Sequence, residues 1–145
     1  MGVFSSMDIS ASGMTAQRTR LDIISQNIAN VNTTRDADGN AYNRKTVVFQ
    51  EKAYVSFNDT LCAATGRVGN GVKIVNIVED TDTEGRLVYD PSHPDADENG
   101  YVLYPNVNTV TEMTNMIDAS RSYEANVTAF NATKNMHLKA LEIGK

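Results

Sequence analysis

The strongest chemical signal in the sequence is one short acidic run, Asp95-Ala96-Asp97-Glu98-Asn99-Gly100. It has the pattern of the first six positions of a calcium-binding EF-hand loop, in which side-chain oxygens bind the cation. The twelfth position of such a loop supplies a bidentate Glu, but here it is Asn106, whose amide cannot chelate in that way. The flanks indicate a loop and a strand, where the motif needs two helices. We therefore interpret the run as a solvated acidic turn.

Other groups that could do catalysis are isolated from one another. His93 and Asp95 could begin a metal site or an acid–base pair, but the only other histidine is His137. A hydrolytic metal site usually needs three converging protein ligands. Cys62, the single cysteine, has no evident histidine partner. Because no set combines a nucleophile, a base and an oxyanion donor, the sequence predicts a protein that is not an enzyme and needs no cofactor.

Two long helices are predicted at the ends of the chain. Apolar residues from Met7 to Val31 recur at helical spacing and predict a helix of about 24 residues, or about 36 Å. A second helix of about 34 residues, or roughly 51 Å, is predicted to begin with a capping box in which Thr109 is the N-cap and Glu112 is N3. Its apolar stripe contains Val110, Met113, Ile117, Val127, Phe130, Leu138 and Leu141. The first helix is too short to cover this stripe, so the remainder is predicted to need a partner molecule.

Short β-type runs and turn signals fill the segment between the helices. The predicted strands are Lys45–Phe49, Tyr54–Phe57, Val72–Val78 and Tyr101–Tyr104. The fold class is therefore α+β: two long terminal helices that form an antiparallel coiled coil, with a small antiparallel β-rich middle unit and long loops. The predicted domains are residues 1–33 and 109–145, the two helices of an inner coiled-coil domain, and residues 34–108, a β-rich outer domain.

Charge divides the chain in the same way. The net charge is −5; residues 34–108 hold twelve acids and seven bases, and the two ends together hold six of each. Neutral ends can pack against copies of themselves without repulsion, whereas an acidic centre suits a solvent-facing position. The acidic balance argues against nucleic acid as a partner. No run approaches the ~18 apolar residues that cross a bilayer, and no signal-peptide pattern precedes the first helix. We expect no membrane insertion.

Apolar and amide residues on both helices are predicted to pack in an assembly, where buried amides would fix the register. The predicted packing residues are Leu21, Ile24, Gln26, Asn27, Ile28, Asn30, Met113, Ile117, Tyr123, Asn126, Val127 and Phe130. Two alternatives stay open: the apolar residues form the core of a monomeric helical hairpin, or the amides face solvent. A further alternative is a soluble coiled-coil adaptor that forms a closed dimer.

The stretch Ser25-Gln26-Asn27-Ile28-Ala29-Asn30-Val31-Asn32-Thr33 resembles the N-terminal signature of the flagellar axial proteins, the family of rod, hook and hook-associated proteins. The stretches Tyr89–Val102, Tyr104–Asn108 and Ala119–Asn126, together with Glu112-Met113, resemble the proximal rod members of that family. The residues of the signature loop are Pro91, His93, Pro94, Asp97, Gly100, Tyr101, Pro105 and Asn106.

This resemblance implies a structural subunit of the proximal rod that polymerises through its terminal helices, transmits torque and lines the export channel. The implied partners are the chain itself, other flagellar rod proteins, basal-body ring and adaptor proteins, and the flagellar type III export apparatus. The implied location is the basal body, in the rod that crosses the periplasm. The resemblance also implies export without a cleaved signal peptide.

Overall fold

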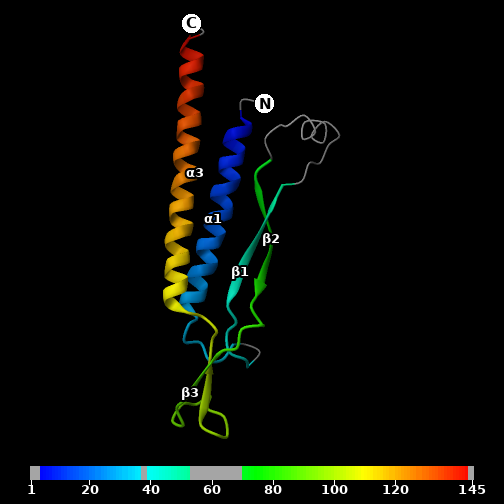
Figure 1. Ribbon diagram of the computed structural model, residues 1–145, viewed down its shortest axis with the longest axis vertical. Helices are drawn as coiled ribbons and strands as arrows, with labels where there is room; N and C mark the ends of the chain where they lie inside the picture. The colour runs from blue at the N-terminus through cyan, green and yellow to red at the C-terminus, as the bar shows by residue number, and fades with distance from the viewer. Residues whose placement is uncertain (1–3, 37–38, 53–69, 144–145) are drawn as a thin grey trace. The chain divides into compact units, whose positions relative to one another are not determined.

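The computed structural model describes residues 4–36, 39–52 and 70–143. Figure 1 shows its elements in chain order: α1 (Ser5–Ala29), β1 (Lys45–Glu51), β2 (Val72–Glu79), β3 (Arg86–Tyr89), β4 (Tyr101–Tyr104) and α3 (Thr109–Ile143). The predicted α+β layout with two terminal helices is confirmed. The coiled-coil pairing of the helices stays a prediction. The predicted strand Tyr54–Phe57 and Cys62 lie outside the described residues.

Helix α1 begins and ends two residues earlier than predicted. Its last turn tightens after Ala29, where the Val31 amide donates to the Ile28 carbonyl at 3.3 Å, an i to i−3 bond that the α-helical ladder does not use. The apolar spacing continues through this turn, so the pattern alone did not show where the helix ends.

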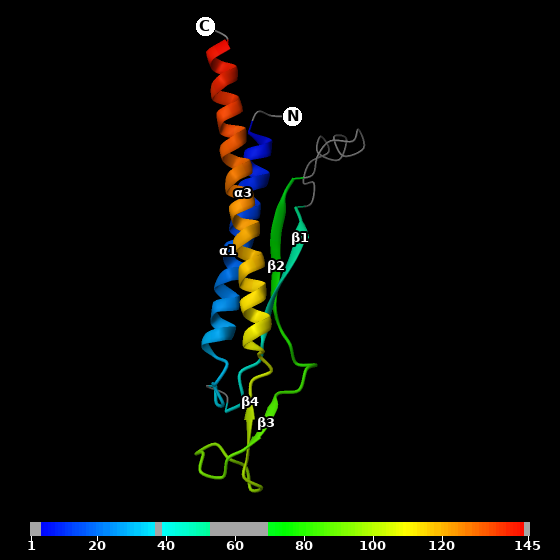
Figure 2. The ribbon, with the colours of Figure 1, turned by 60° about the vertical axis from the view of Figure 1, so that its left-hand side comes forward.

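In the part of the chain that the structure describes, four strands form two separate two-stranded sheets. In the first sheet, the Asp80 amide donates to the Arg44 carbonyl at 2.8 Å and the Lys52 amide donates to the Gly71 carbonyl at 2.9 Å, which makes β1 and β2 antiparallel. In the second sheet, β3 and β4 form the antiparallel hairpin visible in Figure 2, with Leu87 opposite Leu103. The sequence analysis did not predict β3.

Asn108, not Thr109, is the N-cap of α3, which corrects the predicted capping box. The Asn108 side-chain Oδ1 accepts from the amides of Val110 at 3.0 Å and Thr111 at 3.2 Å. Its carbonyl accepts from the Glu112 amide at 2.9 Å. Asn and Thr are both good N-caps, and a shift of one residue moves Glu112 from N3 to N4. The carboxylate of Glu112 is therefore free to bond elsewhere.

The chain buries a different stripe of α3 from the one that the apolar pattern predicted. The residues of α3 that are buried or half-buried at steps of four and three are Glu112, Met116, Ala119, Tyr123, Asn126, Phe130, Thr133 and His137. Most of the predicted apolar stripe stays outside: Val110, Met113, Ile117, Leu138 and Leu141 are 50–73% exposed. The inward stripe therefore mixes polar and small side chains with Met116, Tyr123 and Phe130, while several other large apolar side chains face solvent.

The chain divides into two compact units, and each unit contains part of both helices. Unit 1 comprises Met1–Thr19, Val48–Asn76 and Ala119–Lys145, and unit 2 comprises Arg20–Val47 and Ile77–Asp118. The assignment of residues 1–33, 34–108 and 109–145 to inner and outer domains stays a prediction, because it concerns an assembly.

Within unit 1, small residues let the elements approach one another closely. Ala16 of α1 and Ala119 of α3 are buried. A Cβ on Gly13 would lie only 2.8 Å from the Asn126 Oδ1 atom, so the glycine provides room for that amide. The Val72 amide donates to Ser12 Oγ at 3.1 Å. Gly13 is thus a packing residue of α1.

Candidate assembly site in the terminal helices

Asn27 belongs to unit 2, and its side chain is fully buried. Its Nδ2 donates to the Lys45 carbonyl at 2.8 Å and to Glu112 Oε2 at 3.0 Å. Its Oδ1 accepts from the Lys45 amide and from the Tyr42 hydroxyl, both at 2.9 Å. An amide has two donor hydrogens and two acceptor lone pairs, and all four are used. Asn27 therefore acts as a strand partner for Lys45 and fastens α1 to the start of β1.

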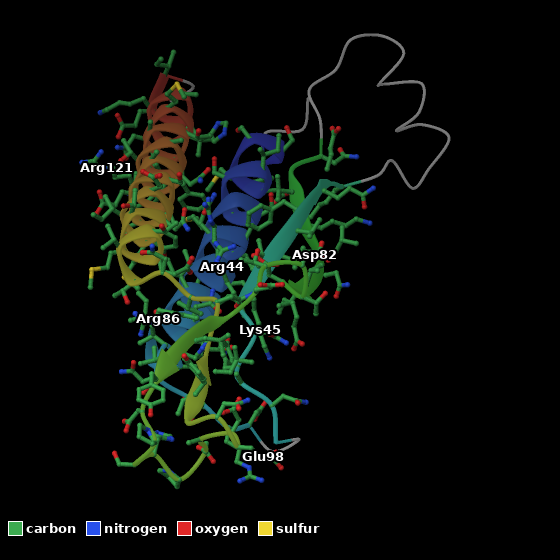
Figure 3. All side chains as sticks on the ribbon, turned by 60° about the horizontal axis from the view of Figure 1, so that its bottom comes forward. Arg44, Lys45, Asp82, Arg86, Glu98 and Arg121 are labelled. Atoms are coloured by element: carbon green, nitrogen blue, oxygen red, sulfur yellow. The ribbon has the colours of Figure 1, made fainter. Side chains whose placement is uncertain are left out.

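Glu112 brings a carboxylate into the same place, with only 1% of its surface exposed. Its Oε1 accepts from Arg44 Nε at 2.9 Å, lies 2.9 Å from Arg44 Nη2, and accepts from Asn115 Nδ2 at 3.3 Å. A buried carboxylate is costly unless it is paired and hydrogen-bonded, and here both conditions are met. Asn27, Tyr42, Arg44 and Glu112 form what we name the Asn27–Glu112 cluster. Figure 3 labels Arg44, a member of this cluster, and Lys45, the first residue of β1, whose backbone bonds Asn27.

Tyr42 enters this cluster as a hydrogen-bond donor. Burial is the main cause that raises the pKa of its phenol above the ordinary value of 10.0, partly offset by the nearby Lys45 ammonium. The hydroxyl therefore keeps its proton at neutral pH and donates it to Asn27 Oδ1. The amide of Asn27 is consequently held in one orientation by its partners.

Asn106 of the signature loop forms a second amide clamp beside the cluster. Its Oδ1 accepts from the Arg44 amide at 2.8 Å, and its Nδ2 donates to the carbonyls of Asp80 at 2.8 Å and Thr83 at 3.0 Å. The residue before it, Pro105, is buried. Asn106 stands where an EF-hand would have its calcium-binding Glu. Here it links the residue before β1 to the residues after β2.

The acidic run of the signature loop folds as a hydrogen-bonded turn. Asp97 Oδ1 accepts from the amides of Asn99 and Tyr101, both at 2.9 Å. Asp95 accepts from the Thr34 hydroxyl at 2.8 Å and lies 3.4 Å from Arg35 Nη1. Within residues 4–36, 39–52 and 70–143, no group of three or more His, Cys, Asp or Glu side chains could hold a metal ion.

The remaining signature-loop residues shape the loop. His93 is half-buried; its Nδ1 accepts from the Asp95 amide at 3.1 Å, and its ring centre lies 6.5 Å from that of Tyr104. Pro91 and Pro94 are exposed. Gly100 has a φ of +79°, a conformation that glycine adopts without strain.

The other predicted packing residues are spread between core and surface. Ile24 is buried, Leu21, Ile28, Asn30, Tyr123, Asn126, Val127 and Phe130 are half-buried, and Gln26, Met113 and Ile117 are exposed. Asn30 and Asn126 each donate to a carbonyl four residues earlier in their own helix. Among the side-chain amides of the described helices α1 and α3, only Asn27 is fully buried, and its partners are the Lys45 backbone, Tyr42 and Glu112 rather than another side-chain amide. The role of these residues in an assembly stays a prediction.

Sequence reasoning missed Tyr42 and Arg44 and gave Glu112 a capping role. The only local signal is that Tyr42 and Arg44 stand directly before a predicted strand, which is too common to indicate a buried ion pair. None of the described helices meets the length and hydropathy that a membrane span requires.

Comparison with known proteins matches both ends of the chain. Residues 7–35, which include Asn27, match the family described as "Flagella basal body rod protein". Residues 98–143, which include Asn106 and Glu112, match "Flagellar basal body rod FlgEFG protein C-terminal".

Relatives that match over their full length share one name. The chain is 49% identical over 151 residues to the flagellar basal-body rod protein FlgC of Bacillus subtilis, covering 100% of both chains. It is 44% identical over 153 residues to FlgC of Borreliella burgdorferi, covering 99% of this chain and 98% of the relative. It is 41% identical over 145 residues to FlgC of Salmonella typhimurium, covering 100% of both. The chain therefore belongs to the family of flagellar basal-body rod protein C.

Proposed function

We propose that this protein is a polymerising subunit of the proximal rod, whose terminal helices pack against neighbouring subunits, transmit torque and line the export channel. Family membership already makes it a structural component of the flagellar basal-body rod and not an enzyme. The proposal adds how the chain does this work, through residues 1–33 and 109–145 as an inner domain and residues 34–108 as an outer one.

The exposed apolar stripe of α3 is the observation that carries the proposal. Val110, Met113 and Ile117 are each more than half exposed, although they lie on one helical stripe. Fully burying such a side chain contributes roughly 1.5–3 kcal/mol relative to leaving it exposed. A row of exposed apolar side chains marks an interaction surface. Covering it with a neighbouring subunit would make assembly favourable.

The Asn27–Glu112 cluster supports the torque-bearing role. Its hydrogen bonds are directional and hold α1, the start of β1 and the first turn of α3 in one register within unit 2. A shift of either helix would leave buried polar groups without partners, at a cost of about 1–3 kcal/mol for each group. Such a cluster resists sliding between elements more than apolar packing does, because apolar contacts have no fixed direction.

The proposed partners follow from a polymer built on this exposed stripe. A repeated interface between two different faces of the chain does not close on itself and so generates a helical polymer. The partners that we propose are further copies of the chain, other rod subunits, basal-body ring and adaptor proteins, and the flagellar type III export apparatus. The acidic residues 34–108 suit an outward position in that assembly.

The test introduces a charge into the exposed stripe. Ile117→Asp should leave the secondary structure of the purified chain unchanged, because the side chain is already exposed, but should prevent incorporation into basal bodies and abolish swimming. Ala129→Asp is the matched control: Ala129 is also exposed and lies about 120° around the helix from Ile117. Circular dichroism, immunoblots of isolated basal bodies and swimming assays give the three measurements. Normal incorporation and swimming with Ile117→Asp would contradict the proposal.

The closed-dimer adaptor makes a different prediction. Sedimentation equilibrium of the purified chain should show a monomer if the exposed stripe is covered only by neighbouring subunits in the rod. A stable dimer that is lost with Ile117→Asp and kept with Ala129→Asp would instead favour the adaptor.

A further inference from the structure

The hairpin of β3 and β4 presents one apolar face to solvent. Side chains alternate along a strand, so Leu87 and Tyr89 share a face with Leu103 and Tyr101, the residues paired opposite them. All four are 44–65% exposed. The opposite face contains Val102, which is fully buried. We name the four exposed residues the hairpin face.

The hairpin face is held in shape before any partner binds. The rings of Tyr89 and Tyr101 contact edge to face, with centroids 5.3 Å apart and an interplanar angle of 65°. Asp97 Oδ1 accepts from the Tyr101 amide at 2.9 Å. A Cβ on Gly100 would lie 3.0 Å from the Tyr89 ring, so glycine is needed where the loop closes on that ring. A rigid aromatic surface loses little side-chain entropy on binding.

Charge restricts what can cover this face. Residues 79–104, which form the hairpin and its flanks, hold eight acids and one base, Arg86, for a net charge of −7. Figure 3 shows Glu98 and Arg86, which belong to this segment. A partner that brought further acids would be repelled, since like charges across an interface cost several kcal/mol. The expected occupant is apolar and cationic.

The last ten residues of α3 have these properties. Lys134, Leu138 and Leu141 follow one another at steps of four and three and so share one stripe. Leu138 is 50% and Leu141 is 73% exposed. Residues 134–143 hold two lysines and one acid, Glu142, for a net charge of +1. We name the stripe of Lys134, Leu138 and Leu141 the α3 tail face.

The two faces also match in length. A four-residue strand extends about 13 Å, and a ten-residue helical segment extends about 15 Å. The leucines and tyrosines of both faces are exposed.

We propose that the α3 tail face of one copy docks on the hairpin face of a second copy. This inference rests on the proposed function, since it needs a polymerising subunit. The two faces differ, so the contact is heterologous and leaves one tail and one hairpin free at the ends of each pair. Leucines would lie on the tyrosine pair, and Lys134 would lie near the hairpin acids.

Cysteine cross-linking between two kinds of copy tests the contact. The chain's single cysteine is first removed with Cys62→Ser, and this parent receives either Leu103→Cys or Leu141→Cys. The two variants are produced together in flagellated cells that lack their own copy of the gene. Isolated basal bodies are oxidised and run on a non-reducing gel. A cross-linked dimer should form in the mixture and not with either variant alone.

A control pair replaces Leu141→Cys by Asp22→Cys on the exposed polar side of α1 and should give no dimer. No dimer from the mixture, with both variants present in basal bodies, would overturn the docking and leave the proposed function standing. Equal dimer from one variant alone would also overturn it, because it would mean a symmetric contact. Absence of the unmodified chain from basal bodies would instead count against the proposed function itself.

Charge reversal gives a second, independent readout. Lys134→Glu in the Leu141→Cys copy should lower the dimer yield by roughly threefold or more, because it brings an acid to an acidic face. Glu98→Lys in the Leu103→Cys copy should restore part of the yield. An unchanged yield in both cases would show that charge does not select this contact.

Discussion

The Asn27→Asp substitution is the sharpest test of the buried cluster, because it changes one group and keeps the side-chain shape. It removes both hydrogens that Asn27 donates, to the Lys45 carbonyl and to Glu112 Oε2. It also places a second carboxylate about where the Nδ2 atom lies, 3.0 Å from Glu112 Oε2. The Arg44 guanidinium already pairs with the other oxygen of Glu112.

The size of the effect follows from this distance. Two full charges about 3 Å apart repel by roughly 5 kcal/mol at an effective dielectric constant of about 20. Protonating the introduced carboxyl avoids this repulsion at a cost of about 1.4 kcal/mol per pH unit above its reference pKa of about 3.9. That cost is about 4 kcal/mol at pH 7 and about 1.5 kcal/mol at pH 5. The lost bond to Lys45 adds about 1 kcal/mol.

We therefore expect Asn27→Asp to lower the free energy of unfolding by about 5 kcal/mol at pH 7 and about 2.5 kcal/mol at pH 5, estimates that combine repulsion, protonation and the lost bond. The sign follows from linkage: the folded state raises the pKa of the introduced carboxyl, so stability falls as pH rises above the unfolded value. Urea unfolding followed by circular dichroism at both pH values measures this.

Two comparisons make the test specific. Adding Glu112→Gln to Asn27→Asp should remove most of the pH dependence between 5 and 7, because only one carboxyl then remains at the site. Asn30→Asp is the matched control, since Asn30 is half-buried and its side chain bonds nearby Gln26 and Thr33; it should change stability by less than about 1 kcal/mol. Equal losses at the two pH values, or simple additivity with Glu112→Gln, would refute the reasoning.

Three further predictions concern glycines and one aspartate. Gly100→Ala should lower the melting temperature more than Gly39→Ala, because both glycines have positive φ but only the Cβ at Gly100 would meet close neighbours; similar losses would contradict this. Gly13→Ala should lower the melting temperature, because the added Cβ would lie 2.8 Å from the Asn126 Oδ1 atom. This is expected although Ala is more favourable than Gly within a helix by about 1 kcal/mol. A stabilised variant would show that the amide moves away at little cost. The Thr83 hydroxyl and amide are the main causes that hold the pKa of Asp80 below its usual 3.8. Thr83→Ala should therefore raise this pKa in an NMR titration, and the stability that the carboxylate contributes, present above the unfolded pKa, should be lost at a higher pH as acid is added. An unchanged titration would assign the low pKa to the backbone bonds alone.

The sequence determined the elements and the family. Helical spacing located both terminal helices to within two residues, because amphipathic periodicity is a local property of the chain. Alternation and turn residues located β1, β2 and β4 for the same reason. The signature around Asn27 and the loop before Asn106 indicated the family, which the comparisons confirm.

Only the tertiary structure decided which side of each helix faces inward and which polar groups meet. The apolar pattern of α3 predicted a stripe through Met113 and Ile117, yet the chain buries the stripe that begins at Glu112. A sequence pattern cannot show this, because a carboxylate is inward-facing only if a guanidinium and an amide reach it from distant parts of the chain. Those partners, Arg44 and Asn27, lie 68 and 85 residues away. Hydrogen-bond satisfaction over such separations is a property of the fold, and in α3 it is met while several large apolar side chains remain exposed to solvent.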